Sequence, residues 1–128
     1  MSHIDPLFKV LASLLDSYDV QMSLIEAVDP GNLRTMAIAS LKRTISQDLK
    51  KIDILEETLL IQIQNEANKS FEFVALVAEA SKDEEKRTLT DLRASLAQKC
   101  LEQEMTLEAK FITTKLYLLG VQSAVEKM

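Results

Sequence analysis

Hydrophobic positions recur at a helical period along nearly the whole chain. The stretch from Asn32 to Leu119 contains neither proline nor glycine. The two residues of each kind lie outside it, at Pro6, Pro30, Gly31 and Gly120. A β-sandwich or barrel needs turn residues every ten or so positions, and this stretch does not supply them. The pattern therefore predicts an all-α protein, an antiparallel helical bundle of three long helices.

The first predicted helix covers residues 6–28. Asp5 is suited to cap it, and Pro6 suits the first helical position because the missing N–H costs nothing there. The apolar residues follow in steps of four and three, the spacing of a coiled-coil seam. They are Ile4, Phe8, Leu11, Leu15, Tyr18, Met22 and Ile25. Pro30 and Gly31 then predict a tight turn, and such a short connection favours an antiparallel helix pair.

The second and third predicted helices cover residues 33–80 and 83–126. The apolar stripe of the second runs through Ile38, Leu41, Ile45, Leu49, Ile52, Leu55, Leu59, Ile63, Ala67, Phe71, Val74 and Ala78. Ser81 followed by Glu84 matches a capping box and predicts the boundary between the two helices. The third stripe contains Leu89, Leu92, Leu96, Cys100, either Met105 or Leu107, Phe111, Leu118, Val121 and Val125.

These lengths have a geometric consequence. Helices of this size are about 65–70 Å long, whereas the first helix is about 35 Å long. The first helix therefore covers only half of the hairpin, and the other half becomes a two-helix coiled coil with an exposed apolar edge. This arrangement predicts a dimer in which two uncovered ends form a four-helix bundle. The alternative is a break near residues 65–70, which gives a compact four-helix bundle.

Composition and charge limit the range of possible functions. With 128 residues, of which 47 % are hydrophobic, the chain suits a single all-helical domain over residues 1–128. Its net charge of −5 disfavours nucleic acid and anionic membranes. The lone Cys100 excludes an internal disulfide and suggests a reducing, cytoplasmic location. We find no signal peptide and no membrane span in the sequence.

The residue types that catalysis needs are scarce. His3 is the only histidine, so a phosphotransfer histidine on a helix face, a di-iron bundle and a histidine-rich zinc site are all excluded. Cys100 lies in the apolar stripe and is best explained as a small buried hydrophobe. Neighbouring acids such as Glu56 and Glu57 point about 100° apart on a helix and do not converge. We expect no catalytic residue, metal, cofactor or small-molecule substrate, and no enzyme activity.

Two close basic pairs suggest a different function. Lys42–Arg43 and Lys50–Lys51 place Arg43 and Lys50 seven residues apart, on one helix face. Asp48 and Asp53 interrupt this pattern, and no aromatic residues accompany it. For this reason we keep a dimeric nucleic-acid-binding regulator, which would use these four basic residues, only as the alternative function.

Three stretches are too apolar for a one-sided helix: residues 58–63, 71–78 and 116–121. Either two neighbours enclose them within the bundle, or they form a second apolar face for a partner. The candidate interaction residues are Ile61, Phe71, Phe73, Val77, Tyr117 and Leu119.

We therefore expect a non-enzymatic protein–protein interaction module that binds partner helices or a second copy of itself. Adaptors, secretion-type chaperones and structural assembly subunits belong to this class. In size, acidity and helical content the chain is similar to small cytoplasmic export chaperones of bacteria, a class likeness that no motif carries.

Overall fold

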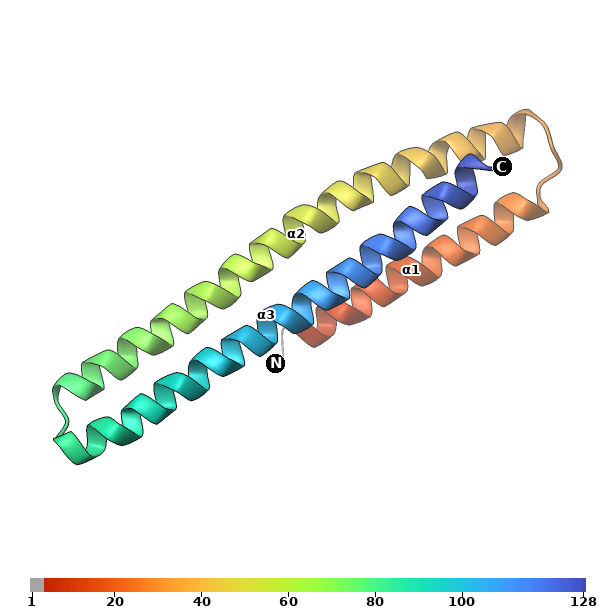
Figure 1. The fold of residues 1–128 in the computed structure, drawn as a ribbon. Coiled ribbons are helices and arrows are strands. Elements are labelled where there is room, and N and C mark those ends of the chain that lie inside the picture. Colours follow the sequence, from red (N-terminus) through yellow and green to blue (C-terminus); the bar gives the residue numbers. More distant parts are fainter. Residues whose placement is uncertain (1–3) are drawn as a thin grey trace. The chain divides into compact units, whose positions relative to one another are not determined.

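The structure, a computed structural model, describes residues 4–128, with side chains from residue 6 onward. Its helices are α1 (Ile4–Ala27), α2 (Asn32–Glu79) and α3 (Asp83–Glu126), as Figure 1 shows. The predicted all-α helical bundle is confirmed. Because α2 continues without interruption through residues 65–70, the compact bundle with a break there is not formed. His3 lies outside the described residues. Because α1 begins at Ile4, Asp5 already lies within the helix, so the prediction that Asp5 caps it was wrong.

The chain ends its helices close to the predicted boundaries. Between α1 and α2, the Val28 N–H donates to the Ile25 carbonyl, and the Thr35 N–H donates to the Gly31 carbonyl. At the end of α2, the Ser81 hydroxyl donates to the Val77 carbonyl at 2.6 Å. These bonds satisfy backbone groups that a helix terminus leaves without partners.

The start of α3 differs from the predicted capping box by one residue. The Lys82 N–H donates to the Glu85 carboxylate at 3.2 Å, so Glu85 takes the part expected of Glu84. The reason is that α3 begins at Asp83, which makes Lys82 the capping residue and Glu85 the third helical residue. Three acids in the first turn also suit the positive end of the helix dipole.

The helices form two compact units. Unit 1 contains the described residues up to Ile54 together with Ala109–Met128, and unit 2 contains Leu55–Glu108. Unit 1 thus has three helical segments, from α1, α2 and α3, whereas unit 2 has two, from α2 and α3. The single domain predicted from the sequence stays a prediction.

Unit 1 has a well-filled core. In this unit α1 runs alongside α3 (Figure 1), a hydrogen bond from Tyr18 to Asp48 joins it to α2, and all three helices contribute buried side chains. From α1 these are Leu11, Tyr18 and Ile25; from α2, Leu41, Ile45 and Ile52; from α3, Phe111, Leu118, Val121 and Val125. The α1 residues are seven apart, as the predicted seam requires. A third helix allows each apolar stripe to be enclosed from two sides.

Three polar contacts also link the helices of unit 1. The buried Tyr18 hydroxyl donates to Asp48 of α2 at 2.5 Å. Lys115 of α3 pairs with Asp53 of α2 at 2.6 Å. The Lys110 ammonium lies 5.5 Å from the centre of the Phe8 ring, within cation–π range. Each helix of the unit is therefore joined to another by a charged group with a defined partner.

Unit 2 has a much thinner core. Among its apolar side chains only Ile63, Val74 and Leu107 are buried. A hairpin of two helices gives each helix one neighbour, so only the residues on the shared line lose their contact with water. Other apolar residues of the predicted stripes, such as Leu89 and Leu96, are half-buried.

The contact between Tyr18 and Asp48 makes stability depend on pH in a predictable direction. Burial of the ring, with the adjacent Asp48 carboxylate adding to it, raises the pKa of Tyr18 above its ordinary value. The folded state therefore retains this proton more strongly than the unfolded state. The stabilisation is fully present below about pH 10 and is lost as the pH rises above it.

We expect Tyr18→Phe to lower the free energy of unfolding at neutral pH by about 1 kcal/mol, since Asp48 loses its donor. The variant should also show a smaller loss of stability above about pH 10 than the wild type. Urea denaturation followed by circular dichroism, at neutral pH and above about pH 10, measures the loss of stability in each protein. Equal losses in the two proteins would show that Tyr18 is not the responsible group.

Candidate partner-binding surface

Many of the large hydrophobic side chains in this chain lie outside the core. Within the described residues, sixteen large hydrophobic side chains are exposed, compared with thirteen buried ones. Isolated exposed hydrophobic residues are normal on any protein, but clusters of them mark interaction surfaces. The positions of these side chains on the helices therefore decide whether a partner surface exists.

The six candidate interaction residues predicted from the sequence are divided between the two units. Ile61, Phe71, Phe73 and Val77 belong to α2 in unit 2, whereas Tyr117 and Leu119 belong to α3 in unit 1. Ile61, Phe73 and Leu119 are exposed, and the other three are half-buried. Four of the six thus belong to unit 2 and two to unit 1.

In unit 2, the stretch 71–78 points in several directions. Val74 is buried against α3, whereas Phe73 and Leu76 are 67 % and 65 % exposed. Phe73, Leu76 and Val77 are spaced i, i+3, i+4 and therefore share one flank of α2. Phe73 and Leu76 on this flank are exposed and not covered by the other helix of unit 2, and Val77 at its edge is half-buried. We call Phe73, Leu76 and Val77 the α2 strip.

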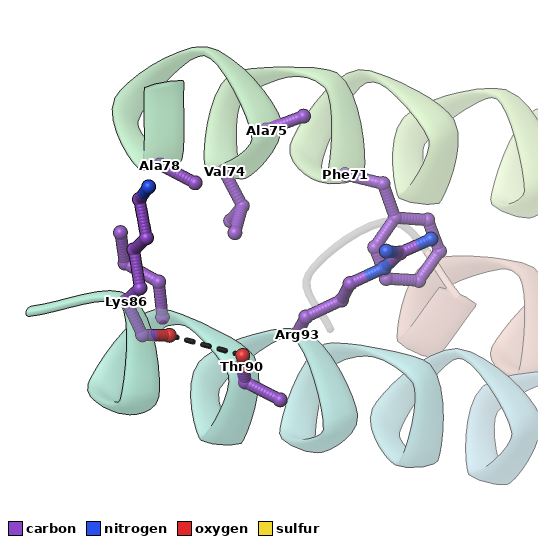
Figure 2. A pocket seen from close by; sticks show the side chains of 8 residues that line it. Phe71, Val74, Ala75, Ala78, Lys86, Thr90 and Arg93 are labelled. Carbon is purple, nitrogen blue, oxygen red and sulfur yellow. Dashed lines mark hydrogen bonds between the residues drawn. The ribbon is translucent and has the colours of Figure 1, made fainter. Parts of the chain in front are cut away.

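Phe71 lies on a different side of the same helix. It lines a groove between the end of α2 and the start of α3, shown in Figure 2. The Arg93 guanidinium lies 5.8 Å from the centre of the Phe71 ring, and the Thr90 hydroxyl donates to the Lys86 carbonyl at 2.9 Å. The residues that line this groove are Phe71, Val74, Ala75, Ala78, Lys86, Leu89, Thr90 and Arg93. The ring of Phe71 is thus already partly covered within the chain.

Sequence reasoning missed several exposed apolar residues. In unit 2 these are Leu76, Leu92, Leu101 and Met105; in unit 1 they are Val10, Val20, Leu24, Leu33, Met36, Ile54, Ile112, Leu116 and Met128. One signal was available: Met105 and Leu107 are two residues apart and cannot both face the same neighbour. The structure buries Leu107 completely and leaves Met105 exposed.

The third apolar stretch, residues 116–121 in unit 1, also contains both buried and exposed side chains. Leu118 and Val121 are buried, whereas Leu116 and Leu119 are exposed. Tyr117 is half-buried between these two sides of α3. The surplus apolar residues of this stretch therefore face outward from unit 1.

Charge is divided unevenly between the two units. Unit 2 has twelve acidic and six basic residues, a net charge of −6, whereas unit 1 has eight acidic and nine basic residues, a net charge of +1. On α3 in unit 2, Leu101 and Met105 lie among Glu102, Glu104 and Glu108. An apolar surface within an acidic unit suits a partner that is both apolar and basic.

The surroundings of Cys100 disfavour its use as a nucleophile. Burial and the neighbouring Glu104 carboxylate raise the pKa of the Cys100 thiol, whose Sγ lies 3.7 Å from Glu104 Oε1. A raised pKa disfavours the thiolate that nucleophilic chemistry needs. Among the residues from 4 onward, the structure brings together no group of three or more potential metal ligands.

The basic pairs of α2 do not converge on one surface. Arg43 and Lys50 share a face, but Lys42 and Lys51 are nine residues apart, two and a half turns, and therefore lie on opposite sides of the helix. The two acids that interrupt the pattern have other contacts, Asp48 with Tyr18 and Asp53 with Lys115. Only two of the four basic residues thus form a common surface.

Comparison with models of known protein families, with curated proteins and with solved structures finds no match to this chain. In the part of the chain that the structure describes, no helix is both long and apolar enough to cross a membrane. The surface of the two units is therefore the available evidence for function.

Substitutions at two neighbouring positions distinguish partner surface from core. We expect Phe73→Ala to change the free energy of unfolding by less than about 0.5 kcal/mol, because this side chain is exposed. The adjacent Val74→Ala should cost about 2 kcal/mol, because it removes buried methyl groups from a thin core. Urea denaturation of both variants measures the difference. A larger cost for Phe73→Ala than for Val74→Ala would place Phe73 in the core.

Proposed function

We propose that this protein is a non-enzymatic, cytoplasmic helix-binding adaptor or chaperone, and that unit 2 binds an amphipathic helix of a partner protein. The observation that supports this most strongly is the imbalance within unit 2. Three of its apolar side chains are buried, whereas Ile61, Phe73, Leu76, Leu92, Leu101 and Met105 are exposed. A two-helix hairpin with so little buried surface gains stability from a further helix.

The α2 strip is the most suitable contact for such a helix. Phe73 supplies an exposed aromatic ring, and aromatic residues are enriched among those that dominate binding energy. Leu76 and Val77 extend the strip by one turn, in the spacing that an amphipathic helix itself uses. Glu72 and Glu79 are exposed at neighbouring positions of α2 and limit the apolar area around the strip.

The charge of unit 2 indicates the chemistry of the partner. A net charge of −6 repels acidic segments, including a second copy of the same unit, and attracts basic ones. The proposed partner segment is therefore an amphipathic helix with an apolar stripe flanked by lysine or arginine.

Synthetic peptides of about 20 residues, long enough to become helical on binding, test this function. One carries a leucine stripe flanked by lysines, a second has glutamates in place of the lysines, and a third has the first composition with the leucines scattered. Fluorescence anisotropy should show the tightest binding for the first peptide. Phe73→Ala with Leu76→Ala should weaken that binding at least about tenfold, because both contacts are lost.

The matched control is Val10→Ala, in α1 of unit 1, where the side chain is 64 % exposed. This variant should bind the lysine-flanked peptide as the wild type does. Equal binding of the scattered peptide would show that charge alone drives association. Unchanged binding by the Phe73 and Leu76 variant would contradict the proposed site.

A further inference from the structure

Between residues 109 and 124, the outer face of α3 carries no charge. The exposed residues between positions 109 and 124 are Ala109, Ile112, Thr113, Leu116, Leu119, Gly120, Ser123 and Ala124. We call these eight residues the α3 face. It extends over about 22 Å of helix. In a chain of which 27 % is charged, an exposed helix face of this length without any charge is a distinctive feature.

The two lysines in this segment face elsewhere. Lys110 lies over the Phe8 ring of α1, and Lys115 pairs with Asp53 of α2, so both are directed to other helices of unit 1. The Thr113 hydroxyl donates to the Ala109 carbonyl at 2.8 Å and is satisfied within the helix. By contrast, exposed positions on α2 in the same unit include Arg43 and Lys50. The α3 face therefore differs from the exposed side of α2.

We infer that the α3 face is covered by the same face of a second copy of this chain, with the two α3 helices antiparallel and Leu116 on the two-fold axis. Unit 2, with a net charge of −6, repels a second copy, whereas unit 1 has a net charge of +1. An uncharged face opposes itself without that repulsion. This surface lies in unit 1 and is separate from the α2 strip proposed for the partner helix.

The order of large and small residues supports this register. In a two-fold antiparallel pair, a residue a given number of positions before the axis faces the residue the same number after it. Ile112 is four positions before Leu116, and Gly120 is four positions after it. Thr113 and Leu119 are three positions before and after. Leu116 thus meets its own counterpart at the axis, and the other large side chains, Ile112 and Leu119, each face a smaller residue of the second copy.

Gly120 has the space that such a contact needs. A Cβ atom placed on this residue meets no other atom within 4 Å, so its surroundings within the chain are open. The other short side chains, Ala109 and Ser123, lie seven positions on either side of Leu116. Small residues at the ends and large ones near the axis allow two helices to approach closely.

The oligomeric state in solution tests this inference. Light scattering and sedimentation equilibrium should give the wild type a mass of twice 14.4 kDa. Leu116→Glu, at a position 63 % exposed, should give a monomer because two glutamates would meet at the axis. The control Val20→Glu adds the same charge to α1 at a side chain 58 % exposed, and it should remain dimeric. A monomeric wild type, or a dimeric Leu116→Glu, would overturn the inference.

Gly120→Leu tests the register without endangering the fold. The open space at Gly120 accepts the side chain, and leucine favours the helix more than glycine does. Helix content should therefore be kept, while the dissociation constant of the dimer should rise at least about tenfold, because the new side chain meets Ile112 of the second copy. An unchanged dissociation constant would contradict the antiparallel register.

Cross-linking locates the axis directly. In a Cys100→Ala background, Leu116→Cys should be joined to its counterpart by a short bis-maleimide, whereas Val20→Cys should not. Covalent dimer from Val20→Cys but not from Leu116→Cys would overturn the inference. Failure of the α3 contact is distinguishable from failure of the proposed function: monomeric Leu116→Glu should still bind the lysine-flanked peptide.

Discussion

The structure depends on where a third helix is available to cover the apolar stripes of α2 and α3. In unit 1, α1 places Leu11, Tyr18 and Ile25 against both of these helices, and each helix contributes to a common core. In unit 2 the same two helices have only each other, and only Ile63, Val74 and Leu107 are buried among the apolar residues. Burial of apolar area is the main source of stability, so unit 2 contributes less of it.

This difference explains how one chain presents two kinds of surface. Unit 2 combines a net charge of −6 with uncovered apolar residues, a combination that suits a basic amphipathic helix. Unit 1 has nearly balanced charge and an uncharged outer face on α3, which suits contact between identical copies. Joining copies through one unit leaves the other available for a partner. The proposed surfaces for self-association and for partner binding, the α3 face and the α2 strip, therefore consist of different residues.

The sequence predicts the helices well because their signals are local. Pro30 and Gly31 mark one turn, and the acids from Asp83 onward mark the start of α3. The sequence does not decide which of two nearby apolar residues is buried. Periodicity leaves Met105 and Leu107 as alternatives, and Leu92 lies on the predicted stripe but is exposed. The outcome depends on how two helices meet, which is a tertiary property. The uncharged α3 face is also hidden in the sequence, because Lys110 and Lys115 interrupt it until their contacts in unit 1 are known.

The measurement that tests this account most directly is amide hydrogen exchange of the isolated protein, because exchange reports the stability of each part separately. Two segments of the same helix, residues 41–52 in unit 1 and 60–74 in unit 2, provide the comparison. We expect amides of residues 60–74 to exchange faster than those of residues 41–52, because few buried side chains hold that part of α2 in place and less free energy is needed to open it. Equal protection along the whole of α2 would contradict it, because unit 2 would then be complete without a partner.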